Sequence, residues 1–194
     1  MLQSPLPPSP GALEHCSIDL VNSEIHLPGN KVFDALATPE STTQWLIERN
    51  LVPEEASLQT YCQNRLTTLR AQVREAFTAS SSKRTVEHAA LQGINAALLA
   101  APNTPLLRQQ EGRGFFRSLE HPATQFTEHA LATLAEEAAT LLSSDEASLL
   151  SLCEAEPCTR FYLRTHGRRQ WCSTRCGDRV RAARSYARKK EQKL

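Results

Sequence analysis

Four cysteines within residues 153–176 constrain the fold of this chain more than any other feature. Their spacing is C-x4-C-x13-C-x3-C, two pairs separated by an arm long enough for a hairpin. Two pairs at this separation are typical of a closed tetrahedral zinc site, in which each Zn–S bond is about 2.3 Å long. The predicted cofactor is one structural Zn2+ ion, because four thiolates leave no open position for a catalytic water. The predicted ligands are Cys153, Cys158, Cys172 and Cys176.

Disulfide bonds are the weaker reading of these cysteines. The N-terminal run lacks the basic start and apolar stretch of a secretory signal, so we expect a cytoplasmic chain with reduced thiols. No segment approaches the roughly 18 apolar residues that cross a bilayer, so no membrane contact is expected. Cys16 and Cys62 lie far from the cluster and are predicted to be small buried apolar residues.

The segments around the cysteines predict a treble-clef-like finger. Residues 160–163 and 168–171 read as the strands of a hairpin, with His166 exposed at its tip. The i, i+4 spacing of Cys172 and Cys176 puts both sulfurs on one face of a first helical turn, with Ser173 as N-cap. A module this small has few large apolar groups, so its stability is expected to depend on the metal.

The formal charge of +1 hides a strong asymmetry along the chain. Residues 1–150 carry 10 Lys and Arg against 17 Asp and Glu, a balance of −7, whereas residues 151–194 carry 12 against 4, a balance of +8. This split indicates a basic C-terminal module with its own polyanionic partner.

An arginine-rich helix is predicted after the last cysteine. A narrow apolar stripe formed by Cys176, Val180, Ala183 and Ala187 can rest on the zinc core while arginines occupy the remaining surface. Arginine suits bidentate recognition of phosphate or guanine, so duplex DNA is the favoured partner. The predicted contacts are Arg168, Arg169, Arg175, Arg179, Arg181, Arg184 and Arg188. RNA stays open, because Phe161, Tyr162, Trp171 and Tyr186 could stack on bases, although packing of Phe161 and Trp171 on the finger is preferred.

The rest of the chain reads as a mainly α body. Helices are predicted over about 39–47 with Thr38 as N-cap, 57–78, 86–100 and 124–143, and a β-hairpin around the sequence EGRG. The run at 17–23 could be a strand or the start of a helix, and HLPGN reads as a turn. The expected organisation is a disordered proline-rich leader at 1–14, a helical domain at 15–148 and the finger at 149–194.

These motifs resemble a known pair of bacterial domains. The tail, with RRQWCSTRCGDR at its centre, is similar to the CGNR zinc finger, from which it departs at Asp178, where the family name has Asn. The body segments IDLVNS, DALATPESTTQWL, VREAF and GINAALLA are similar to the ABATE domain of stress-induced transcription regulators. The resemblance implies a zinc-dependent DNA-binding regulator of stress- or ligand-responsive type. A ligand pocket for a small-molecule effector would include Asn22, Arg70, Arg74 and Asn95, unless these side chains only join helices.

Two other classes of function remain as alternatives. The finger could be a zinc-stabilised module for binding protein or RNA without sequence-specific DNA binding. An enzyme is not expected, because the chain lacks nucleophile-elbow, phosphate-loop and HExxH motifs. A homodimer is a further expectation, since helical regulators are often two-fold symmetric.

Overall fold

The computed structural model describes residues 4–101, 106–118 and 125–192. The expected leader residues 1–3, residue 124 and residues 193–194 lie outside these ranges. The helices are α1 (Cys16–Val21), α2 (Pro39–Ile47), α3 (Thr60–Ser81), α4 (His88–Ala100), α5 (Phe126–Ser143) and α6 (Thr174–Glu191), with a 3-10 turn, η1 (Asp145–Leu149). The strands form three antiparallel pairs: β1 (Glu24–Leu27) with β2 (Lys31–Asp34), β3 (Leu106–Gln110) with β4 (Gly114–Ser118), and β5 (Leu150–Leu152) with β6 (Phe161–Leu163). The predicted mainly α class is confirmed.

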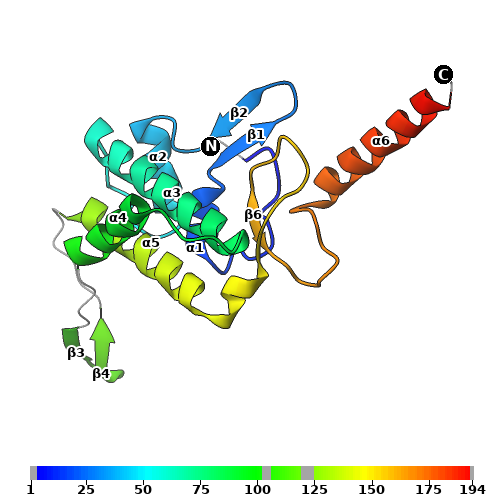
Figure 1. Ribbon diagram of the computed structural model, residues 1–194. Coiled ribbons are helices and arrows are strands. Elements are labelled where there is room, and N and C mark those ends of the chain that lie inside the picture. Colours follow the sequence, from blue (N-terminus) through cyan, green and yellow to red (C-terminus); the bar gives the residue numbers. More distant parts are fainter. Residues whose placement is uncertain (1–3, 102–105, 119–124, 193–194) are drawn as a thin grey trace.

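The body is built on the packing of α3, α4 and α5 (Figure 1). Apolar side chains at steps of three and four along α3, such as Leu66, Val73 and Phe77, are fully buried against Ile94 of α4 and Leu134 of α5. Alanines at several buried positions of α5 let the helices approach closely. The core therefore has the periodicity expected from the sequence.

Helix α2 begins where the sequence predicts. Thr38 Oγ1 accepts a hydrogen bond from Ser41 N at 3.2 Å, and Ser41 Oγ accepts one from Thr38 N at 3.1 Å, which completes a capping box. Pro39 occupies the first turn, where its missing N–H costs nothing.

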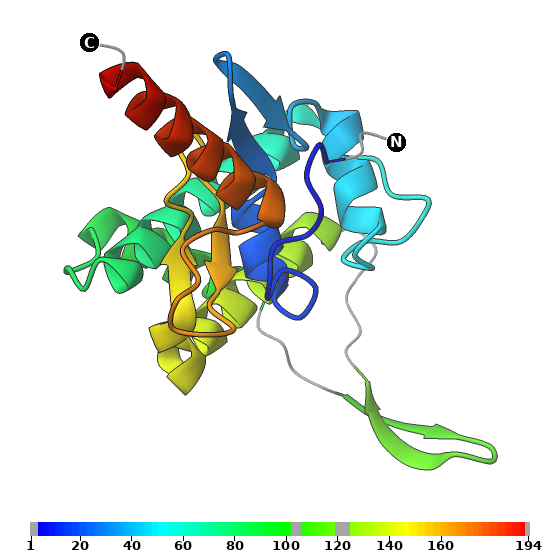
Figure 2. The same cartoon turned by 90° about the vertical axis from the view of Figure 1, so that its right-hand side faces the viewer.

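Two hairpins interrupt the helices. Residues 17–23 are mostly helical, and the predicted HLPGN turn proves to join two strands, β1 and β2, which the sequence analysis did not predict. The loop between them has three residues, 28–30, in which Gly29 and Asn30 adopt φ of +77° and +57°, a conformation that glycine and asparagine tolerate better than other residues. The predicted hairpin around EGRG is present as β3–β4, and Figures 1 and 2 show it standing away from the helices.

The expectation of a disordered leader is wrong for residues 4–14. Leu6, Ser9 and Ala12 are buried, and Leu163 N donates a hydrogen bond of 2.9 Å to Pro10 O. Figure 2 shows this segment in dark blue beside the start of α6. Proline-rich composition suggested disorder because it provides few apolar groups, but an extended segment needs only one surface to pack on, and the finger provides it.

Candidate metal centre and basic helix

The four cysteines of the predicted site meet at one point of the structure. Their Sγ atoms all lie within 4.8 Å of one another, and all four residues are buried. The Sγ atom of Cys172 lies 3.7 Å from those of both Cys158 and Cys176. A tetrahedron with Zn–S bonds of about 2.3 Å has an edge of about 3.8 Å, so this spacing fits a single zinc ion. The predicted structural zinc cofactor is confirmed.

The chemistry of the four sulfurs also calls for a cation. Hydrogen bonds to the neighbouring sulfurs, first of all that of Cys153, raise the pKa of Cys172 far above the usual range of a thiol. A hydrogen bond with Cys153 also raises the pKa of Cys158, whereas hydrogen bonds from the neighbouring sulfurs lower the pKa of Cys153 and Cys176. Four thiolates at these distances repel one another strongly, and a divalent cation removes that repulsion.

Short local contacts place the ligands. Cys153 directly follows β5, and its Sγ accepts a hydrogen bond from Cys172 N at 3.4 Å. Cys158 N donates to Ala155 O at 2.8 Å, which closes the loop between the first two ligands. Ser173 Oγ accepts a hydrogen bond from Cys176 N at 3.3 Å, so the predicted N-cap starts α6 at the fourth ligand.

A buried arginine beside the zinc ligands was missed by the sequence analysis. Arg160 is only 3% exposed, and its Nη1 lies 4.0 Å from Cys172 Sγ. Its Nη2 donates to Pro7 O at 2.6 Å, which ties the N-terminal segment to the finger. A tetrathiolate zinc site carries a net charge of −2, so a buried guanidinium at this position compensates part of it. Among twelve cationic residues in the tail, no local pattern singled this one out.

The prediction that residues 160–163 and 168–171 pair as a hairpin inside the finger is wrong. Strand β6 pairs with β5 rather than with residues 168–171, which form no strand. Phe161 of β6 points into the body, where its ring meets that of Phe77 edge-on with centroids 5.7 Å apart. Arg169 instead closes the loop by accepting a hydrogen bond at its carbonyl oxygen from Tyr162 Oη at 2.9 Å. The finger therefore shares the core of the body, because its own strand is too apolar to stay at its surface.

Asn22 holds β6 onto the body. Its side chain, 6% exposed, donates to Phe161 O and accepts from Phe161 N, both at 2.8 Å. Arg74 of α3 adds a hydrogen bond of 2.8 Å to Thr159 O, just before the strand. These contacts provide hydrogen-bond partners for backbone groups at and just before the edge of β6, which lies in the protein interior.

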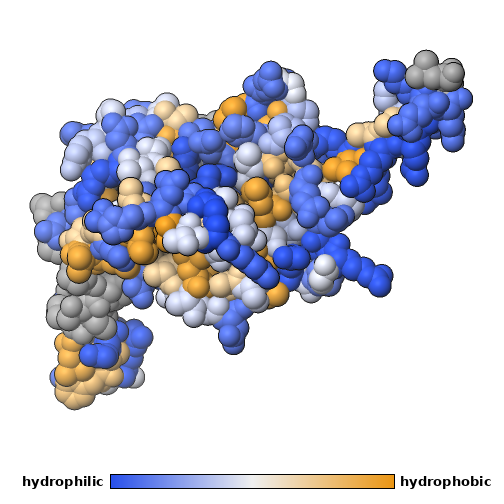
Figure 3. Space-filling view, viewed as in Figure 1, coloured by the Kyte–Doolittle hydropathy of each residue, from blue (hydrophilic) through white to orange (hydrophobic). Residues whose placement is uncertain are grey.

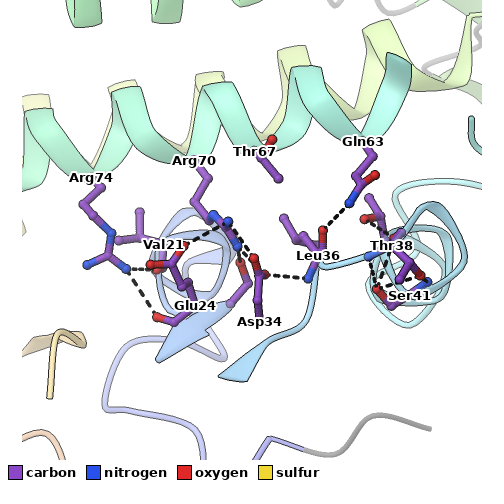
Figure 4. A network of polar contacts seen from close by, with 12 residues as sticks. Val21, Glu24, Asp34, Leu36, Thr38, Ser41, Gln63, Thr67, Arg70 and Arg74 are labelled. Atoms are coloured by element: carbon purple, nitrogen blue, oxygen red, sulfur yellow. Dashed lines mark hydrogen bonds and ion pairs between the residues drawn. The ribbon is translucent and has the colours of Figure 1, made fainter. Parts of the chain in front are cut away.

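The side chain of Arg70 likewise binds other groups of the protein. Its guanidinium donates to both carboxylate oxygens of Asp34 at 2.6 and 3.0 Å and lies 3.1 Å from Glu24. Figure 4 shows Arg70 and Arg74 pointing from α3 toward the β1–β2 hairpin. Burial raises the pKa of the Asp34 carboxyl, but the hydrogen bonds from Arg70 and from Leu36 N, together with the charge of Arg70, outweigh it and hold that pKa below its usual value.

The predicted ligand pocket does not exist as a unit. The side chains of Asn22, Arg70 and Arg74 bind other protein groups, and the exposed Asn95 lies on α4, where it lines a different groove. Only Asn22 lines the cavity of about 570 Å³ that lies between the N-terminal segment, α1 and α2. The polar residues shared with the family segments therefore join elements of the fold and do not line a common pocket.

The predicted DNA-contact residues divide into two groups. In the first, the side chains bind the finger or the N-terminal segment: Arg169 donates to Cys172 O, Arg175 to Pro5 O and Arg179 to Ala155 O. Arg181 pairs with Asp178 at 2.6 Å and lies over the ring of Trp171, 5.3 Å from its centroid. Arg169 and Arg179 are only partly exposed as a result.

The second group is free. Arg168, Arg184 and Arg188 are exposed and have no hydrogen-bond or ion-pair partner among the described residues. The apolar stripe of α6 belongs to the zinc core only at Cys176 and Val180, and both Ala183 and Ala187 are exposed, so the expected full-length stripe is wrong. Beyond Val180 the helix projects from the molecule, and its visible surface in Figure 3 is mostly hydrophilic.

Comparison with known proteins agrees with this architecture. The profile of the ABATE family, described as "Putative stress-induced transcription regulator", matches residues 14–145. The profile of the CGNR zinc finger matches residues 150–189. A search of curated proteins gave no match. None of the described helices is long and apolar enough to span a bilayer. The chain therefore belongs to the ABATE family, and its ABATE region is followed by a CGNR zinc finger.

Proposed function

We propose that this zinc-binding, regulator-like protein binds duplex DNA through the projecting half of α6. The observation that carries the proposal is the set of unpaired cations on that half. Arg184, Arg188, Lys189 and Lys190 are all exposed and make no hydrogen bond or ion pair with any described residue. A helix anchored at one end by zinc and free over its outer turns has the dimensions to enter a major groove.

The zinc site supports this role by fixing the direction of the helix. Cys172 precedes the N-cap and Cys176 lies in the first turn, so two of the four metal ligands hold the start of α6. Trp171 and Val180 pack against the same small core. The cations are thus presented on a rigid support, which lowers the entropy lost on binding. No enzymatic activity is proposed, because a four-thiolate site has no open coordination position.

The test is a salt titration of DNA binding with purified zinc-loaded protein. If about six phosphates are neutralised, the slope of log affinity against log salt is about −5, and the double variant Arg184→Ala/Arg188→Ala reduces its magnitude by about 2. Arg113→Ala removes an exposed cation at the tip of the β3–β4 hairpin and serves as the matched control, with an unchanged slope.

Two outcomes would contradict the proposal. Zinc-loaded protein that does not bind duplex DNA at low salt would favour the alternative of a protein-interaction module. Binding that prefers RNA of the same length would reassign the partner. Selection from a random DNA pool then reports whether the binding is sequence-specific.

The body supports a second part of the proposal, regulation by a small-molecule effector during stress. The cavity of about 570 Å³ is lined by Trp45, Arg49 and Arg160, among others. Because Arg160 also lies beside Cys172, a ligand in this cavity would act on the base of α6. A thermal-shift screen of small metabolites tests this part, and Trp45→Ala should abolish any stabilisation that is found.

A further inference from the structure

Two apolar surfaces of the body are uncovered in the ranges that the structure describes. The first is one face of the β3–β4 hairpin, where Leu107 and Phe115 are each 70% exposed. In the antiparallel register Leu107 lies opposite Arg117 and Gln109 opposite Phe115, so these four residues share one face. Figure 3 shows hydrophobic side chains gathered on this protruding hairpin, at the lower left.

A projecting two-stranded hairpin is a poor structure by itself. Isolated hairpins are marginally stable in water and usually require a third strand or a packing surface. Large exposed apolar side chains on a protruding element are typical of an interaction site. The hairpin therefore needs an apolar surface that accepts Leu107 and Phe115.

The second uncovered surface is a groove of about 400 Å³ between α3, α4 and α5. Leu91, Ile94 and Leu142 contribute to its lining, and Leu91 is 45% exposed. The groove is hollow and apolar, whereas the hairpin face is protruding and apolar.

Charge decides which of these surfaces pair. Residues 106–118 carry three arginines and one glutamate, a balance of +2, while the rest of residues 1–150 carries 7 Lys and Arg against 16 Asp and Glu, a balance of −9. The groove lining includes Arg84, whose guanidinium pairs with the carboxylate of Glu75 at 2.5 Å. The exposed Glu87 adds a second carboxylate beside this pair, one helical turn before Leu91, so the three side chains carry a net charge of −1. Two hairpins would repel each other, but Arg117 on the hairpin face complements the net negative charge of this cluster at the groove.

We propose that the β3–β4 hairpin of one copy of this chain docks into the α3–α4–α5 groove of a second copy, and the second hairpin into the first groove. Such an exchange is two-fold symmetric and closes on itself, so it ends at a dimer. Within a single copy the hairpin leaves its own groove open, because both Phe115 and Leu91 are exposed there. The pairing uses the body alone and does not depend on whether α6 binds DNA.

The first test measures the mass of the full-length zinc-loaded protein by light scattering over about 1 to 100 μM. The mass should approach twice 21.6 kDa as the concentration rises. Phe115→Asp and Leu91→Asp should each weaken the dimer by about 30-fold or more, since each places a charge at the centre of the contact. Val32→Asp, at an exposed residue of β2, is the matched control and should leave the dimer unchanged.

The second test mixes the two disrupted variants. The Leu91→Asp chain keeps an intact hairpin, and the Phe115→Asp chain keeps an intact groove. A mixture of the two should therefore form a heterodimer, although each variant alone is monomeric. Circular dichroism and zinc content verify that both variants fold. A wild type that stays monomeric throughout overturns the proposal, and a mixture that stays monomeric shows that the hairpin does not dock in this groove.

Discussion

The arginines at the junction of body and finger and those on the outer half of α6 have the same side chain but opposite surroundings. Arg74 and Arg160 donate to backbone carbonyl oxygens and are largely removed from water. Burial lowers the pKa of the Arg74 guanidinium, although Glu24 opposes the shift. Arg184 and Arg188 are exposed and have no partner among the described residues.

The difference teaches that a high arginine content does not by itself mark a nucleic-acid surface. In the junction, the forked guanidinium joins strand, loop and N-terminal segment, which a lysine could not do with the same geometry. On the outer helix, the same group keeps its donors free. Neighbours, rather than residue type, assign each arginine its role.

Loss of the metal should break the junction as well as the finger. Cys172→Ser should reduce bound zinc from one ion per chain to none, and it should lower the melting temperature of the whole chain by about 10 °C. The body is affected because Phe161 and Leu163 belong to its core. Elemental analysis and a circular-dichroism melt measure both effects. Cys62→Ser is the matched control, and a body that melts unchanged without zinc would show that the two parts are independent.

Asn22→Ala should weaken the junction without touching α6. The change leaves the N–H group of Phe161 without its partner in a buried site, while its carbonyl oxygen keeps the hydrogen bond from Ser9 Oγ. The expected cost is about 1 to 3 kcal/mol of unfolding free energy. Urea denaturation measures the loss. Asn95→Ala, at an exposed position of α4, should cost less than about 0.5 kcal/mol. Equal losses in the two variants would mean that the Asn22 contacts contribute little.

Gly177→Ala tests how the base of α6 is seated. An added Cβ would lie 2.8 Å from Trp171 Cε3, so the ring must move. Overpacking of this kind costs about 1 to 3 kcal/mol, and the better helix propensity of alanine returns about 1, so a net loss of up to about 2 kcal/mol is expected. The double variant Gly177→Ala/Trp171→Leu should lose less unfolding free energy than the sum of the losses of the two single variants, because the smaller side chain removes the overlap. Strict additivity would indicate no contact between the two residues.

The smallest effect on stability is expected on the outer helix. Arg184→Ala should change the unfolding free energy by less than about 0.5 kcal/mol. Arg179→Ala, three residues after Cys176, should cost about 1.5 to 3 kcal/mol, because its guanidinium donates to Ala155 O. Chemical denaturation of the two variants side by side measures the contrast. Similar losses would erase the distinction between bound and free arginines.

Much of the molecule follows from local sequence. The helical periods, the Thr38 capping box and the positive-φ turns depend on residues a few positions apart, so patterns in the chain predict them. The treble-clef-like hairpin failed because strand pairing is not local. Nothing within residues 158–171 says that β6 pairs with β5 and buries Phe161 against α3.

The sequence by itself determined the zinc ligands and the start of α6, because cysteine spacing and an N-cap serine act over one or two turns of chain. Only the tertiary structure decided that residues 4–14 pack against the finger, that the four polar family residues form no common pocket, and which arginines stay free. Those outcomes depend on which surfaces meet across more than a hundred residues, and a contact of that range has no signature in either partner alone.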